Sequence, residues 1–238
     1  MRAIGAIAWR ELASSYRTAT GWVVLALYLA LSGFYVGFAV LEPGGPASLR
    51  PFFAVSQWLL LFVAPAVSMR LFSEELRTGT LEPLRAAPVG EWAIVIGKLT
   101  GAVAFLLTML APTLIFPLIL AWLADPEPGP IVSGYLGLVL VGTAYLSVGM
   151  LWSVTTASQV LSYLGPFFVF VGLWIATGTG ASLAGPPLDE ALYALSFQLR
   201  IRDFARGVID LGHITFFLAF TTWFAVLTVV ALEVRRWR

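Results

Sequence analysis

The segment best suited to nucleotide chemistry is Gly97-Lys98-Leu99-Thr100. A phosphate loop needs the pattern G-x-x-x-x-G-K-[ST], whose backbone amides surround the phosphates. Here Leu99 follows Lys98, and Gly90 lies seven positions before Gly97, which is two more than the pattern allows. The segment also begins a long hydrophobic stretch. We therefore expect no nucleotide site in this chain.

Metal and proton chemistry have few residues to use. The 238 residues include no cysteine and one histidine, His213, which excludes Cys-based metal sites and a His-rich centre. Ion-coupled carriers hold an ionisable group in mid-membrane, and His213 is the sole candidate, near one end of a hydrophobic stretch. A locally hydrogen-bonded histidine is preferred over a proton relay. We expect no catalytic residue, metal ion or cofactor in this chain.

The composition identifies the solvent that this chain needs. It is 59% hydrophobic and 11% charged, with a mean hydropathy of +0.89. A soluble domain usually carries about 25% charged residues, and this chain has too few polar groups to cover its surface. The excess apolar surface requires lipid, so we expect an integral membrane protein with no nucleic-acid partner.

Six stretches are long and apolar enough to cross about 30 Å of hydrocarbon as helices. They are residues 18–41, 52–72, 92–123, 133–154, 160–183 and 211–232. The first is longer than the hydrophobic part of a signal peptide, so we expect an uncleaved anchor. The third contains Pro112 and Pro117, which predict a kink near its far end. The sequence therefore predicts one all-α domain over residues 1–238 with six transmembrane helices.

The connecting segments predict turns and surface helices. Residues 1–17 indicate an amphipathic helix on the membrane surface, with Ile4, Ile7, Ala8 and Leu12 on one side. Residues 125–130 contain three prolines and one glycine, and we expect a turn with no helix there. Residues 155–159 predict a second turn. Residues 188–210 are mixed in polarity and predict one or two short interfacial helices.

The distribution of basic residues predicts the orientation. Ten of the 14 Lys and Arg residues fall in the N-terminal segment, the connection between the second and third spans, and the C-terminus. The other four are Arg50, Arg200, Arg202 and Arg206. Cytoplasmic loops carry the excess of basic residues. We therefore expect both termini and residues 73–91 to face the cytoplasm.

The segment 73–91 carries the most information about function. We expect the second span to continue as a charged helix through Arg77, with Gly79 as its C-cap. Thr80 is a suitable N-cap for a short helix from Leu81 to Ala87, which Pro88 ends. Such a helix across the base of two spans could act as a lever for a partner. A solvated loop is an equally good interpretation from composition alone.

Gly33 and Gly37 form a G-x-x-x-G motif within the first span. This spacing lets two membrane helices approach closely. The motif is common in membrane helices, so packing within the chain is favoured over a dimer contact.

Two motifs resemble those of the ABC type-2 permease family. The run Ser73-Glu-Glu-Leu-Arg-Thr-Gly-Thr-Leu-Glu82, followed by Ala-Pro-Val and then Gly97-Lys98, is similar to the first cytoplasmic loop of these permeases. Residues Phe204-Ala-Arg-Gly-Val-Ile-Asp-Leu211 resemble the "RGVID" segment of one branch. That branch includes the gliding-motility permease and the permease of nitrous-oxide reductase maturation. With the N-terminal helix and six spans, the resemblance covers essentially the whole chain.

The resemblance implies roles for particular segments. Residues 1–17 would be the elbow helix, and 73–91 would hold the coupling helix that contacts a separate ATPase subunit. The implied ATPase-coupling residues are Glu74, Glu75, Arg77, Gly79, Thr80, Leu81, Glu82, Leu84, Arg85 and Pro88. The implied extracytoplasmic exit residues are Phe204, Arg206, Gly207 and Asp210. Pro83 departs from the family, which commonly has Leu there, and it could shorten or tilt the coupling helix.

The resemblance also implies partners and a function. The chain would be the permease subunit of an ATP-binding-cassette exporter in the bacterial inner membrane. It would pair with a second permease chain, identical or related, and with ATPase subunits that bind ATP and Mg. The uncharged spans mildly favour a lipid-like or amphipathic cargo. The alternative is a membrane scaffold that links an ATPase to an extracytoplasmic partner without moving a substrate.

Overall fold

The computed structural model describes residues 2–42, 46–80 and 89–236, and all regular structure within these ranges is helical. Six helical segments are long and apolar enough to cross a membrane, which confirms the predicted number of spans. They are Ala19–Ala39 (α2), Arg50–Thr78 (α3 and α4), Glu91–Leu123 (α6 to α7), Pro128–Thr155 (α8), Gln159–Leu183 (α9 to α10) and Leu211–Arg235 within α13.

Two helices form the centre of the bundle. Within the apolar windows of the spans, 61% of α8 and 56% of the α3 segment are buried, against 22–33% for the other four. Helix α8 packs against α3, α6, α9, α13 and the short helix α12 (Phe197–Ala205). Close approach depends on glycines of α8: a Cβ on Gly137 would come within 2.9 Å of the Phe204 side chain. The outer helices keep large apolar side chains exposed, as expected for a lipid-facing surface.

The second span is broken where the sequence predicted a continuous helix. Helix α3 (Arg50–Ser68) ends before a turn at 69–72, and α4 (Ser73–Thr78) is a separate helix. The prediction of one helix through Arg77 is therefore wrong. The break is stabilised from α8: Ser153 Oγ accepts from the backbone N–H groups of Phe72 and Ser73 at 2.9 and 3.0 Å. These contacts satisfy backbone groups that the turn leaves free.

Prolines affect the next two spans in different ways. The kink predicted near Pro112 is confirmed, because a 3₁₀ segment at Ala111–Leu114 (η1) separates α6 (Glu91–Leu110) from α7 (Ile115–Leu123). The exclusion of helix from 125–130 is wrong, since α8 begins at Pro128. Proline is tolerated in a first helical turn, where its missing N–H has no partner to lose. The turn at 156–158 and two short helices, α11 (Leu188–Ala194) and α12 (Phe197–Ala205), agree with the prediction.

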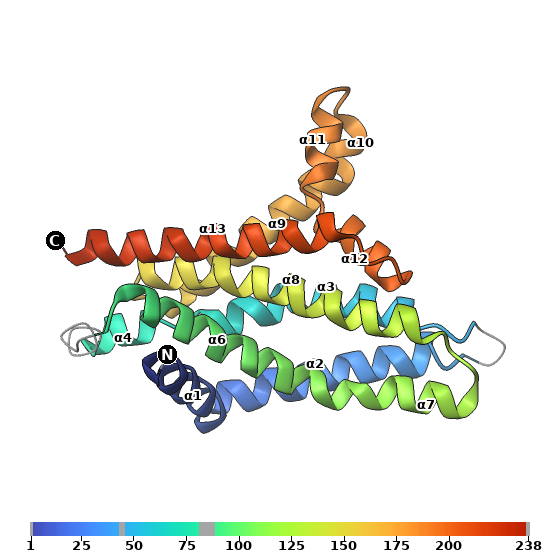
Figure 1. Cartoon of the computed structure of the whole chain (residues 1–238), viewed down its shortest axis with the longest axis horizontal. Coiled ribbons are helices and arrows are strands. Elements are labelled where there is room, and N and C mark those ends of the chain that lie inside the picture. The colour runs from blue at the N-terminus through green and yellow to red at the C-terminus, as the bar shows by residue number, and fades with distance from the viewer. Residues whose placement is uncertain (1, 43–45, 81–88, 237–238) are drawn as a thin grey trace.

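The bundle has two distinct ends (Figure 1). One end, the terminal end, holds α1 (Arg2–Arg17), α4, the turn between α8 and α9, and the end of α13 (Leu211–Arg236). The opposite end holds the α2–α3 and α7–α8 connections and the end of α12. Helix α9 (Gln159–Ile175) leads through a π-helical segment (η2, Ala176–Gly180) to α10 (Ala181–Leu183). Helices α10 and α11 project sideways from the bundle.

Candidate functional site

At the terminal end, α1 lies against α6 on two glycines. A Cβ on Gly97 would lie 2.8 Å from Ile7 Cβ, and one on Gly101 would lie 2.8 Å from the backbone oxygen of Ala8. Both distances are too short for a real Cβ, so only glycine permits this approach. The helix expected over residues 1–17 is present, and the Ile7 side that was expected to face the membrane surface packs against α6. Gly97 and Gly101 thus act as a small-residue contact between helices.

Lys98 lies between these glycines and is almost fully buried. Its Nζ lies 3.2 Å from Glu11 Oε2 on α1 and 3.0 Å from Glu75 Oε1 on α4. It also donates to the backbone oxygen of Leu71, in the turn between α3 and α4, and lies 4.9 Å from the centre of the Phe72 ring. A buried ammonium is stable only with such partners. One side chain therefore joins α6 to α1, to α4 and to the turn.

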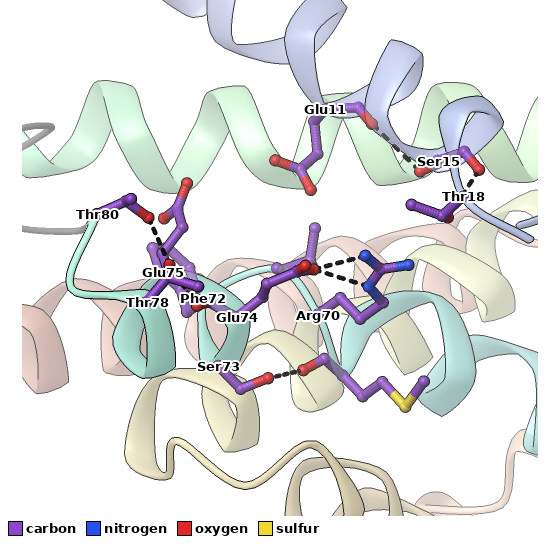
Figure 2. Close-up of polar contacts among 12 residues, drawn as sticks. Glu11, Ser15, Thr18, Arg70, Phe72, Ser73, Glu74, Glu75, Thr78 and Thr80 are labelled. Carbon is purple, nitrogen blue, oxygen red and sulfur yellow. Dashed lines mark hydrogen bonds and ion pairs between the residues drawn. The ribbon is translucent and has the colours of Figure 1, made fainter. Parts of the chain in front are cut away.

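Two arginines, the exposed Arg10 and the half-buried Arg70, complete this charge cluster. We define the cluster as Arg10, Glu11, Arg70, Glu74, Glu75 and Lys98. Arg10 donates to Glu75 Oε1 at 2.9 Å. Arg70 binds Glu74 Oε2 through two nitrogens, at 2.8 and 2.6 Å, as Figure 2 shows. The cluster lines a cavity of about 310 Å³ that also reaches the apolar side chains Val24 and Phe105. The two carboxylates of α4, Glu74 and Glu75, are therefore engaged within the chain.

The structure places the predicted coupling residues in two groups. Glu74 and Glu75 are partly buried in the charge cluster, whereas Arg77, Gly79 and Thr80 are exposed. Gly79 has a φ of +70° and ends α4, so the predicted C-cap is confirmed. Leu81, Glu82, Leu84, Arg85 and Pro88 lie outside the described residues, as does the expected helix 81–87. The N-cap role of Thr80 stays a prediction; its Oγ1 lies 2.9 Å from Thr78 Oγ1 (Figure 2).

Sequence reasoning missed four members of the cluster, namely Arg10, Glu11, Arg70 and Lys98. A usable signal was present: Gly97 and Gly101 have the same four-residue spacing as the G-x-x-x-G motif of the first span and enclose the lysine. The G-x-x-x-G motif of the first span, Gly33 and Gly37, is less closely packed than Gly97 and Gly101. A Cβ on Gly33 would meet only Phe116, at 3.8 Å, and one on Gly37 would meet nothing within 4 Å.

At the opposite end, the segment similar to "RGVID" forms two helix caps. Gly207, with a φ of +92°, follows the end of α12, and Val208 N donates to Asp203 O at 3.0 Å in a Schellman motif. Asp210 Oδ1 accepts from Gly212 N at 2.7 Å and so caps α13. Of the predicted exit residues, Arg206 and Asp210 are exposed. Phe204 is fully buried against Gly137 and faces no open path within this chain.

His213 is hydrogen-bonded locally, as preferred from the sequence. Its Nδ1 lies 2.8 Å from Arg200 Nη1, and its Nε2 lies 3.0 Å from Asp203 Oδ2. Because arginine can only donate, Nδ1 accepts and Nε2–H donates to the carboxylate. Burial lowers the pKa of Arg200 from its ordinary value, and the carboxylates of Asp210 and Asp203 oppose this shift. The histidine side chain thus links α12 to α13.

The described residues contain no group of three or more His, Cys, Asp or Glu side chains placed to hold a metal ion. At the terminal end, the charged side chains form ion pairs with one another and so connect α1, α4 and α6. The chain matches no protein-family model, and no curated protein matches it.

Proposed function

We propose that this chain is the permease subunit of an ATP-binding-cassette transporter of the type-2 class. The six membrane-length helices and the resemblance of residues 73–98 and 204–211 support this proposal. The terminal end would face the cytoplasm of a bacterial inner membrane, because ten of the 14 basic residues belong to segments assigned to that side. ATP hydrolysis would occur in a separate subunit, and a second permease chain would complete the membrane path.

The observation that carries the proposal is the connection of α4 to two other helices through Lys98. Helix α4 leads directly into the segment that would contact the ATPase. Glu75 on α4 and Glu11 on α1 share the Lys98 ammonium of α6, at 3.0 and 3.2 Å. A displacement of α4 would therefore be passed to α6 and α1 directly, through the side-chain contacts of Lys98. This is the geometry that force transmission from an outside motor requires.

The cluster also assigns different tasks to the acidic residues of the segment. Glu75 is 17% exposed, and its Oε1 is already bound by Arg10 and Lys98. It would hold α4 to the bundle and would make little direct contact with an ATPase. Glu82 belongs to the part of the segment for which the resemblance implies direct contact. Docking would therefore depend on Glu82, and transmission on Glu75.

Co-purification and ATPase assays test this division. The chain is produced together with a candidate ATP-binding-cassette ATPase subunit, as wild type, Glu82→Lys, Glu75→Lys and Glu233→Lys. Glu233 is exposed near the end of α13 and serves as a matched charge reversal. We expect Glu82→Lys to lose the ATPase, Glu75→Lys to retain it without transport, and Glu233→Lys to behave as wild type. Nucleotide hydrolysis by the isolated chain, or normal transport by Glu82→Lys and Glu75→Lys, would contradict the proposal.

A scaffold without a transport path is the second candidate. The sideways projection of α10 and α11 favours it, because this arm is available to another protein (Figure 1). Vesicles containing the chain and its ATPase separate the two functions. A transporter accumulates cargo on one side when ATP is added, whereas a scaffold shows ATPase stimulation by its partner and no accumulation.

A further inference from the structure

The opposite end of the bundle contains a basic cavity between α3 and α12. Its volume is about 340 Å³, within the range of ligand pockets, about 300–1,000 Å³. It is lined by Arg50 from α3, by Arg202 from α12 and by Arg206, the C-cap residue of α12. None of the Asp and Glu residues in the described ranges lines it. Three exposed arginines thus line one open cavity, and no carboxylate of the described residues lines it with them.

The spacing of the lining residues shows that one face of each helix builds the cavity. On α3 they lie at positions 50, 54, 57 and 58, and on α12 at 198, 201, 202 and 205, followed by the C-cap residue 206. Both sets follow the spacing of a single helix face. Arg50 starts α3 at the opposite end, and Gly207, which follows Arg206, lies there against Pro130 in the first turn of α8. The cavity is therefore a built feature of two packed helices.

Neighbouring acidic groups have other partners or face other spaces. Asp203 binds His213 at 3.0 Å, and Asp210 caps α13. Asp125 and Glu127 line a second cavity, which Arg50 also lines, and neither of them lines the cavity of Arg202 and Arg206. The fourth arginine at this end, Arg200, donates to His213 and to Ala194 O and lies 3.8 Å above the Phe216 ring. Within the described residues, the guanidinium groups of Arg50, Arg202 and Arg206 form no hydrogen bond or ion pair.

We propose that this cavity binds a phosphate group through Arg50, Arg202 and Arg206. Unpaired guanidinium groups in one cavity repel one another, and an anion removes that repulsion. The planar guanidinium matches phosphate oxygens with two parallel hydrogen bonds. Gln198 adds an amide donor from α12. A phosphate-bearing ligand would therefore bind at this end of the molecule, and its binding does not require a partner ATPase.

The apolar part of the wall indicates how the phosphate is presented. Ala54, Trp58 and Ile201 line the cavity together with the arginines, and α3 has the length and hydropathy of a membrane span. A phospholipid could place its headgroup against the arginines and its glycerol region over the Trp58 ring. Free phosphate would use the arginines alone. Both ligands present a phosphate group to the arginines, and only the phospholipid would also contact the apolar wall.

Calorimetric titration of the full chain in an uncharged detergent tests the proposal. The probes are dihexanoyl phosphatidylglycerol, the zwitterionic dihexanoyl phosphatidylcholine, and inorganic phosphate. We expect saturable binding of the anionic lipid, inorganic phosphate or both, and no comparable binding of phosphatidylcholine. Tighter binding of the lipid than of phosphate identifies a phospholipid site, and equal affinities identify a free-phosphate site. No ATPase or nucleotide is present, so failure here leaves the proposed permease function untouched.

Variants locate the binding to this cavity. Arg202→Gln should weaken binding about tenfold or more, since a charge-assisted hydrogen bond is lost, and Arg202→Lys should restore part of it. Arg17→Gln, an exposed arginine at the terminal end, is the matched control and should bind as wild type. Arg50→Gln tests the same cavity from α3 if Arg202→Gln fails to fold. Unchanged affinity in Arg202→Gln and Arg50→Gln, equal loss in Arg17→Gln, or equal binding of phosphatidylcholine would overturn the proposal.

Discussion

At the scale of single residues, Lys98 determines how the terminal end is held together. The side chain is 1% exposed and has two carboxylates and a backbone oxygen as partners. Desolvation of an ammonium is offset only when several partners are present. The neighbouring Arg10 contacts the same Glu75 but is 51% exposed. Two cations in one cluster should therefore differ greatly in their contribution to stability.

Lys98→Met is expected to destabilise the protein by about 3–5 kcal/mol, because it leaves Glu11 and Glu75 as partly buried acids without their shared cation. Arg10→Gln should lower stability by less than about 1 kcal/mol, since its ion pair is half in solvent. Thermal unfolding of both variants in the same detergent, followed by circular dichroism, measures the difference. Equal effects of the two substitutions would show that the Lys98 contacts are not a buried network.

At the scale of elements, the turn at 69–72 depends on a side chain 80 residues away in the sequence. Ser153 Oγ accepts from Phe72 N and Ser73 N and lies 3.1 Å from Met69 O. Ser153→Ala leaves two buried backbone donors without an acceptor and should destabilise by about 1–3 kcal/mol. Ser182→Ala is the control: its exposed hydroxyl donates only to Thr179 O, so a change within about 0.5 kcal/mol is expected. Urea unfolding in detergent compares them, and an unaffected Ser153→Ala would contradict the assigned role.

The contact of α1 with α6 provides a second test at this scale. Gly101→Ala places a Cβ 2.7 Å from Glu11 Cβ and 2.8 Å from Ala8 O. The backbone of α1 must shift, and a loss of about 1–3 kcal/mol is expected. Gly172→Ala meets nothing within 4 Å and should be neutral or stabilising by up to about 1 kcal/mol. Limited proteolysis after Arg10 and Arg17 should release α1 faster only in Gly101→Ala, and equal cleavage rates would argue against this contact.

At the scale of the whole molecule, the bundle places both termini and α4 at one end (Figure 1). The chain has no cysteine, so a single introduced cysteine reports one position. Thr80→Cys and Asp125→Cys are both at exposed positions, at opposite ends. In intact cells, a membrane-impermeant maleimide should label Asp125→Cys and should reach Thr80→Cys only after permeabilisation. The reverse pattern would invert the proposed orientation and remove the basis for an ATPase contact at residues 73–91.

The sequence by itself determined the features that depend on one-dimensional patterns. The number of spans follows from uninterrupted apolar length, because hydrocarbon excludes unpaired backbone groups. The 3₁₀ break near Pro112 and the cap at Gly79 follow from residues whose own covalent structure limits φ or removes a donor. These properties belong to single residues or to their immediate neighbours, so no tertiary information was needed.

Only the tertiary structure decided where those elements meet. The break after Ser68 depends on Ser153, the burial of Lys98 depends on Glu11 and Glu75, and the cavity of Arg50, Arg202 and Arg206 depends on the packing of α12 against α3. In each case the partner lies far away in the chain. A charge or a turn acquires its role from desolvation and from the groups brought next to it, and neither is encoded in local sequence spacing.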